Sequence, residues 1–271
     1  MAIKLVAIDL DDTLLDSGLQ IAQPCLEAIR QVQDLGIMVT LATGRMYRSA
    51  LPYARQIKAD LPLITYQGAL VKNSLSEEVL YYRPVPEQLT IEVMQYFQRA
   101  QVHFHTYLDD ELCLESLSEE GLAYANMARV EPHLVPDLLA AVRENQPLKI
   151  MAITENEKAL LDMELELKGH YGKLLNITRS KPHYLEVMDR SANKADALQV
   201  IAQHFGLDRR EVLAVGDSYN DLAMIEWAGV GVAMGNARDV VKDAADHVTK
   251  SNEEAGVAEA LHRYVISQYA G

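Results

Sequence analysis

The 271-residue sequence predicts an α/β fold, in which a Rossmann-like parallel sheet core carries an inserted α+β domain. Three observations predict it. Short apolar runs alternate with helical patterns at the start of the chain, and the same alternation returns near its end. The middle of the chain instead combines helical patterns with paired strands. Strands that alternate with helices form parallel sheets covered on both faces, whereas runs of paired strands and helices are typical of α+β domains.

The first part of the chain predicts three strands, with a helix between the first two and another helical pattern before the third. The opening run, residues 3–8, is apolar, rich in β-branched residues and too short for a typical helix, so it reads as a buried strand that ends at Asp9. Gly36 provides the stop signal for the first helix. The predicted elements are strands at residues 3–8, 37–42 and 61–65 and a helix at 23–35.

The last part repeats this order, with a helix at residues 193–205 and strands at 211–215 and 230–234. Ligands of open parallel sheets bind at the carboxyl ends of the strands. Asp9, Thr43 and Asp217 each follow a predicted strand, so we expect them at one edge of the sheet.

The middle of the chain predicts the inserted domain. Helical patterns and paired strands alternate there with turn signals such as Leu108-Asp109-Asp110, which favours an antiparallel sheet. The expected division is a core domain of residues 1–84 and 183–271 and an inserted domain of residues 85–182.

Composition narrows the class of protein. Hydrophobic residues make up 49% of the chain and charged residues 24%, as in a globular protein with a sizeable core. The net charge of -14 disfavours nucleic acid as a partner, although a small anionic substrate still fits a local field of opposite sign. No apolar run reaches the roughly 20 residues of a membrane span, and no signal peptide is evident, so we expect a cytoplasmic protein without a membrane partner. Cys25 and Cys113 stand far apart and read as buried thiols.

An acidic motif, DLDDTLLD, follows the first predicted strand at residues 9–16. Residues two apart in extended backbone point to the same side, so Asp9 and Asp11 can face one small volume. Two carboxylates that close bind a cation or share a proton. One can then attack phosphorus while the other serves as general acid and base. The alternatives are a solvated acidic turn that caps the following helix, or a metal site like those of unrelated glycosyltransferases.

A second acidic motif, GDSYND, follows a later strand at residues 216–221. Magnesium prefers oxygen ligands and usually bridges to substrate phosphate, so Asp9 and Asp217 from neighbouring strand ends suit it. Asn220 and Asp221 then support the metal or position phosphate. The alternative is a turn that leads into a helix, with Ser or Asp as its cap.

Two shorter features point to phosphate. Thr43-Gly44 places a hydroxyl and a glycine amide where a strand enters a helix, and amides and the helix dipole favour an anion there. Lys194 begins a helix and can offset phosphate charge while it keeps a nearby carboxylate ionised. Taken alone, each feature has an ordinary explanation, because Thr-Gly often follows a strand and a single lysine is usually solvated.

In their order along the chain, residues 9–16, 43–44, 194 and 216–221, the four features resemble the motifs of the haloacid dehalogenase superfamily of phosphatases over the whole chain. The insertion between Thr43-Gly44 and Lys194 resembles the type IIB cap of the Cof-type subgroup, which contains sugar-phosphate phosphatase-like hydrolases. The resemblance implies that Asp9 is the nucleophile and Asp11 the general acid and base. It implies metal ligation by Asp9, the main-chain carbonyl of Asp11 and Asp217, with Asp221 acting through water. The implied phosphate-binding groups are the amides of Leu10 and Gly44, the Thr43 hydroxyl, Lys194 and Asn220.

The predicted function is Mg²⁺-dependent hydrolysis of small phosphorylated metabolites, sugar phosphates first, through an aspartyl-phosphate intermediate. A phosphomutase of the same superfamily is one alternative. A receiver-like phospho-acceptor domain is another, but receivers are typically single domains of about a hundred residues without an acid/base partner two residues after the aspartate. The sequence predicts neither the physiological substrate nor the oligomeric state. It also leaves open the roles of Arg45 and of Gln67, which stands where the family often has asparagine.

Overall fold

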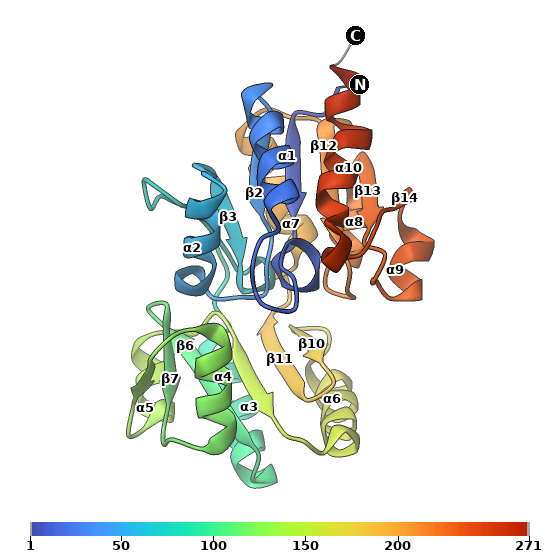
Figure 1. The fold of residues 1–271 in the computed structure, drawn as a ribbon. Helices are drawn as coiled ribbons and strands as arrows, with labels where there is room; N and C mark the ends of the chain where they lie inside the picture. The colour runs from blue at the N-terminus through green and yellow to red at the C-terminus, as the bar shows by residue number, and fades with distance from the viewer. Residues whose placement is uncertain (1, 270–271) are drawn as a thin grey trace. The chain divides into compact units, whose positions relative to one another are not determined.

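The structure, a computed structural model, describes residues 2–269 and divides into two compact units. The first unit comprises residues 1–43, 51–81 and 193–271, and the second comprises residues 44–50 and 82–192. Figure 1 shows the elements of both units in chain order. Each unit has its own sheet.

The first unit is built on a five-stranded parallel sheet with the strand order β14-β13-β12-β1-β2. Its strands are β1 (Leu5–Ile8), β2 (Met38–Leu41), β12 (Val212–Gly216), β13 (Val230–Ala233) and β14 (His247–Val248). β1 and β12 lie in the middle and are buried along their whole length. That burial is why both strands read as continuous apolar runs rather than alternating ones.

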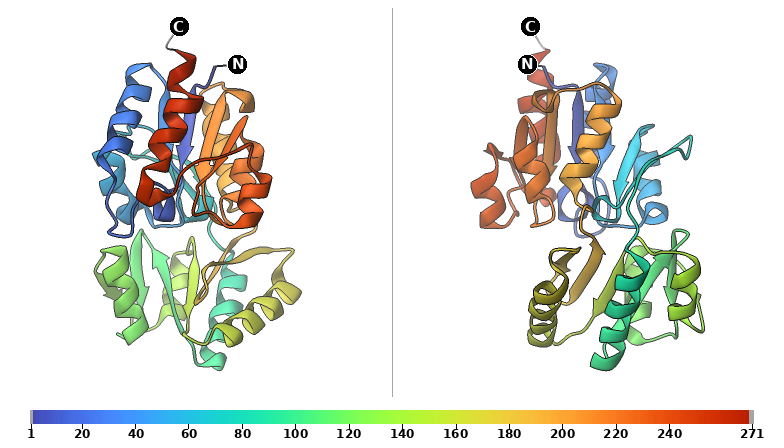
Figure 2. Two further views of the ribbon diagram at one scale, coloured as in Figure 1. Left: turned by 45° about the vertical axis from the view of Figure 1, so that its right-hand side comes forward. Right: turned by 180° about the vertical axis from the view of Figure 1, so that it is seen from behind.

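Helices cover both faces of this sheet, as the two opposite views of Figures 1 and 2 show. α1 (Gln23–Asp34) packs against α10 (Gly256–Tyr264) on one face. α7 (Lys194–His204) and α8 (Leu222–Trp227) lie on the other, where α7 packs on Leu5 and Ala214. The remaining elements of the unit are α2 (Tyr47–Gln56), which begins in the second unit, α9 (Asp239–Ala244), and a small sheet of β3 (Pro62–Thr65), β4 (Leu70–Asn73) and β5 (Val79–Tyr82).

The second unit carries a six-stranded sheet with the order β10-β11-β9-β6-β7-β8. Its strands are β6 (His103–Leu108), β7 (Glu111–Leu114), β8 (Pro132–Leu134), β9 (Ile150–Ile153), β10 (Leu175–Lys181) and β11 (Tyr184–Asp189). Its helices are α3 (Glu87–Ala100), α4 (Glu119–Ala128), α5 (Leu138–Glu144) and α6 (Glu157–Tyr171). Side chains of α3, α5 and α6 join one face of the sheet in an apolar core around Phe97, Ile150 and Leu185. The predicted fold class, a parallel core sheet with an inserted α+β part, is confirmed.

The division of the chain differs from the expected limits at residues 84 and 182. β11 pairs in antiparallel fashion with both β9 and β10, so its hydrogen bonds hold residues up to 192 in the second unit. Residues 44–50 also belong to that unit: Arg48 N–H donates to Asp110 at 2.7 Å and Ser49 Oγ donates to the Ala128 carbonyl at 2.7 Å. The inserted sheet also departs from pure antiparallel pairing, because β8 runs parallel to β7. Within residues 2–269, no helix is both long and apolar enough to cross a membrane.

Candidate functional site

Three carboxylates meet at the carboxyl ends of the two central strands. Asp9 follows β1 and Asp217 follows β12, and the two strands are paired with Ile8 opposite Val215. Asp221 comes four residues after Asp217, at the start of α8. One carboxylate oxygen from each of the three lies within 4.8 Å of the others. The register of neighbouring parallel strands therefore brings together two of the predicted acidic motifs.

Lys194 inserts its ammonium group between two of these carboxylates. Its Nζ lies 2.5 Å from Oδ1 of Asp9 and 2.5 Å from Oδ1 of Asp221, and its side chain has no exposed surface. Asn193 fixes the start of α7, because its side chain accepts a hydrogen bond from the Asp196 amide. Burial acts to lower the pKa of Lys194, but the carboxylates of Asp221 and Asp9 outweigh it and raise that pKa above its ordinary value. Lys194 is therefore a buried cation.

Both oxygens of Asp221 accept hydrogen bonds within the protein. Oδ1 accepts from Lys194, and Oδ2 accepts from the backbone amides of Asp217 and Ser218 at 3.0 Å each. Gly216 makes room for this arrangement, since a Cβ there would lie 2.5 Å from the Cβ of Asp221. Asp221 thus holds the loop that carries Asp217. This placement fits a supporting role better than direct metal ligation.

The two strand-end carboxylates are short of cationic partners. Burial, together with the charge of Asp221, raises the pKa of Asp9 well above its ordinary value. The same two causes raise the pKa of Asp217 to about 7, even though Thr13 Oγ1 donates to its Oδ1 at 2.8 Å. The ammonium group of Lys194 contacts only two of the three clustered carboxylates, Asp9 and Asp221. Buried oxygen donors with excess negative charge fit a hard cation such as Mg²⁺.

The phosphate-binding residues predicted near β2 take up a second part of the site. Thr43 is fully buried, its amide donates to the Ile64 carbonyl at 2.8 Å, and its carbonyl accepts from the Gln67 amide at 3.1 Å. Gly44 follows Thr43 directly and belongs to the second unit. Asn220 lies in the same loop as Asp217, and its Nδ2 donates to Oε1 of Gln67 at 2.8 Å.

The remaining predicted residues lie in the loop after β1. Leu10 is fully buried, Asp11 is half-buried, and Asp12 turns the chain with a φ of 60°. The carboxylate of Asp11 is not among the three clustered groups found within residues 2–269. The structure therefore gathers Asp9, Lys194, Asp217 and Asp221, with Thr43 and Asn220 joined through Gln67.

Sequence reasoning missed two contacts in this site. Thr13 lies in the first acidic motif, four residues after Asp9, and its hydroxyl supports Asp217. Gln67 contacts both Thr43 and Asn220. A hydroxyl inside the acidic motif was a usable signal for the first contact, whereas nothing local to Gln67 indicates the second.

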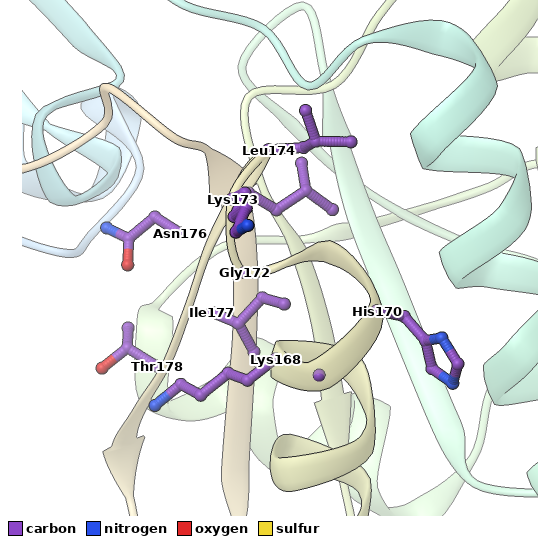
Figure 3. Close-up of a pocket in the computed structure, with 10 residues that line it drawn as sticks. Lys168, His170, Gly172, Lys173, Leu174, Asn176, Ile177 and Thr178 are labelled. Carbon is purple, nitrogen blue, oxygen red and sulfur yellow. The ribbon is translucent and has the colours of Figure 1, made fainter.

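A groove of about 960 Å³ lies in the second unit, where α6 ends and β10 begins. Figure 3 shows Lys168, Lys173, Asn176 and Thr178 around it. None of the predicted site residues lines this groove.

Comparisons with known proteins agree with the geometry. A family model of haloacid dehalogenase-like hydrolases matches residues 6–261. A 5-amino-6-(5-phospho-D-ribitylamino)uracil phosphatase of Bacillus subtilis strain 168 is 32% identical over 266 residues, which cover 96% of this chain and 97% of that protein. The crystal structure of a haloacid dehalogenase-like hydrolase from Bacteroides thetaiotaomicron matches with a TM-score of 0.88 and 32% identity, over 96% of this chain and 99% of that one.

A subclass IIB sugar phosphatase of the superfamily shares the fold, with a TM-score of 0.82 and 23% identity over 96% of this chain and 98% of its own. The predicted family and the predicted enzyme class, a phosphatase of this family, are confirmed. With its parallel sheet, its clustered aspartates and a family match over nearly its whole length, the chain belongs to the haloacid dehalogenase-like hydrolases.

Proposed function

We propose that this protein is a Mg²⁺-dependent phosphatase of small phosphorylated metabolites, with Asp9 as its nucleophile. The observation that carries the proposal is the placement of Asp9 at the end of β1, bonded to the buried Lys194 and beside Asp217 and Asp221. Lys194 holds one oxygen of Asp9 in place and supplies positive charge. An oriented, charge-stabilised carboxylate is what attack on a phosphate ester requires.

The reaction has two steps. A carboxylate oxygen of Asp9 attacks the phosphorus atom in line, the bond from phosphorus to the leaving oxygen breaks, and Asp11 gives its proton to that oxygen. Asp11 then takes a proton from water, the hydroxide oxygen bonds to phosphorus, and the bond from Asp9 to phosphorus breaks. Asp11 suits this role because it lies two residues after Asp9 and is only half-buried, so it can exchange protons with solvent.

Asp9, the carbonyl of Asp11 and Asp217 would hold the magnesium ion, and Asp221 would support it through water. When bound, the ion supplies positive charge that offsets the crowding of carboxylate and phosphate. The amides of Leu10 and Gly44, the Thr43 hydroxyl, Lys194 and Asn220 would bind the phosphate oxygens. These groups come from backbone amides, a hydroxyl, an ammonium and an amide, all of which donate hydrogen bonds to an anion.

The substrate class rests on chemistry and on one relative. The Bacillus subtilis protein is named for a substrate with a phosphate on a ribityl chain. A phosphate ester on a polyhydroxylated chain is also the reacting part of a sugar phosphate, which supports sugar phosphates and phosphorylated polyols as the substrates of this chain. We propose that the second unit, as a cap, selects the leaving group. The cytoplasmic location expected from the sequence stays a prediction.

A panel of phosphorylated metabolites, assayed with Mg²⁺ for release of inorganic phosphate, tests the proposal. Asp9→Asn is expected to abolish turnover, and Asp11→Asn to block it while phosphate still binds. Asp12→Asn is the matched control, because Asp12 lies in the same loop with an exposed side chain and should leave turnover within about threefold. Full hydrolysis by pure Asp9→Asn would contradict the proposal, and interconversion of sugar phosphates without phosphate release would favour a phosphomutase.

A further inference from the structure

The short turn after β3, Tyr66–Gly68, has an unusual backbone. The φ angles of Tyr66, Gln67 and Gly68 are 51°, 57° and 99°, so three consecutive residues lie in the left-handed region. A residue other than glycine costs roughly 1–3 kcal/mol in a sparsely populated region and stays there only when its surroundings fix it. Tyr66 and Gln67 are both buried. The rest of the first unit therefore fixes this turn in place.

The turn contacts three of the predicted motifs at once. The Gln67 amide donates to the Thr43 carbonyl at 3.1 Å, and the Gln67 side chain accepts from Asn220 at 2.8 Å. Gly68 lies against Asn193, the cap residue just before Lys194, and a Cβ on Gly68 would lie 2.2 Å from the Asn193 carbonyl oxygen. A glycine is required here on two counts, its positive φ and this close approach.

The backbone contact sets the direction of a predicted phosphate donor. The peptide between Thr43 and Gly44 is planar and trans, so its N–H points away from its carbonyl oxygen. Because the Gln67 amide holds the Thr43 carbonyl on one side, the Gly44 N–H is directed to the opposite side.

The bond between the side chains of Asn220 and Gln67 orients a second predicted phosphate donor, the Asn220 amide. Asn220 has two N–H groups on its amide, and one of them donates to Gln67 Oε1. That bond selects which end of the Asn220 amide carries the donors, so its second N–H has a fixed direction.

We propose that Gln67 is a positioning residue that orients two phosphate donors, the Gly44 amide and the Asn220 side chain, before substrate binds. This inference rests on the proposed function, since it assumes that both groups bind phosphate. Gln67 does not touch the reacting atoms in this role. Its loss should weaken phosphate binding equally in the ground state and the transition state.

The test is a double-mutant cycle between Gln67→Met and Asn220→Ala. Methionine removes the side-chain amide that accepts from Asn220, while it keeps the length of the side chain and the backbone N–H that donates to Thr43. Gln67→Met is expected to raise KM and the inhibition constant of inorganic phosphate by about tenfold each, with kcat within about threefold. In the Asn220→Ala background the same change should have little further effect, because the two residues act as one unit.

Two further variants serve as a conservative replacement and as a control. Gln67→Asn retains an amide and a residue type that tolerates positive φ, so it should recover part of the lost phosphate affinity even if the methionine variant folds poorly. Gln56→Met is the matched control, because Gln56 is exposed at the end of α2 and should leave KM unchanged. Additive effects in the cycle, or unchanged phosphate affinity in both Gln67 variants, would overturn the inference.

Calorimetric binding of inorganic phosphate to the Mg²⁺-loaded protein separates this inference from the proposed function. If the wild type binds phosphate and the Gln67 variants bind it equally well, the inference alone fails. If the wild type hydrolyses no member of the panel but binds phosphate in a way that depends on Gln67, the proposed function alone fails.

Discussion

Replacing Lys194 with methionine should destabilise the metal-free protein strongly. Methionine has a similar length but no charge, so Lys194→Met leaves Asp9 and Asp221 buried without the ammonium group that now lies 2.5 Å from each. The native site has three clustered carboxylates. After the substitution, none of the three has this cation beside it.

The expected size follows from the burial of both partners. Breaking a buried ion pair by removal of one partner costs about 3–5 kcal/mol, because the other charge stays desolvated. A protein of this size loses roughly 2–4 °C of melting temperature per kcal/mol, which gives a decrease of about 6–20 °C. Turnover should fall at least about a hundredfold, as for loss of other groups that stabilise developing charge.

Thermal melts with a chelator and with Mg²⁺ provide the measurement. Mg²⁺ should raise the melting temperature of Lys194→Met more than that of the wild type, because the ion replaces the missing positive charge. Lys158→Met is the control: its side chain is 85% exposed in a surface pair with Asp162, and such pairs contribute about 0–1 kcal/mol. A metal-free Lys194→Met protein as stable as the wild type at neutral pH would refute the reasoning.

The remaining predictions concern pH. Burial raises the pKa of Asp217 to about 7 from an ordinary value of 3.8, so the unfolded chain loses this proton first as pH rises. Asp217 should therefore contribute a loss of about 1.4 kcal/mol per pH unit to the stability of the metal-free protein between about pH 4 and 7, and melts of Asp217→Asn should show a pH dependence smaller by that amount. Burial, with the nearby His103 and Lys149, holds the pKa of His105 well below its ordinary value of 6.5. His105 therefore has the opposite sign: stability falls as pH drops below about 6.5, and denaturant titrations of His105→Phe should show a smaller decrease.

The strand ends could be predicted from the sequence because they depend on local patterns. A short apolar run followed by a polar residue marks both Asp9 and Asp217, and parallel pairing then places them side by side. Lys194 was found in the same way, as a residue at a helix start. For these residues, the position of each side chain directly after a strand or at the start of a helix is enough to predict that they lie close together.

Other features depend on contacts between distant segments. The sequence alone placed residues 183–271 in the core domain, but the pairing of β11 with β9 and β10 places β11 in the second unit. Gln67 read only as a departure from the family pattern, because its role depends on a left-handed backbone and on Asn220, 153 residues away. Side-chain direction and non-local pairing are not encoded in local periodicity, so such contacts needed the structure.

Stability and chemistry oppose each other at this edge of the sheet. The carboxylates of Asp9 and Asp217 have raised pKa values because water is excluded, and that exclusion also strengthens every charge interaction with a bound phosphate. Polar replacements would lower the cost of folding but remove the groups that we propose attack phosphorus and hold the metal. The fully buried β1 and β12 offer the rigid support that such a site needs. A bound cation is therefore expected both to stabilise the fold and to favour the reaction. It offsets the repulsion among the carboxylates that opposes folding, and the repulsion between carboxylate and phosphate that opposes the reaction.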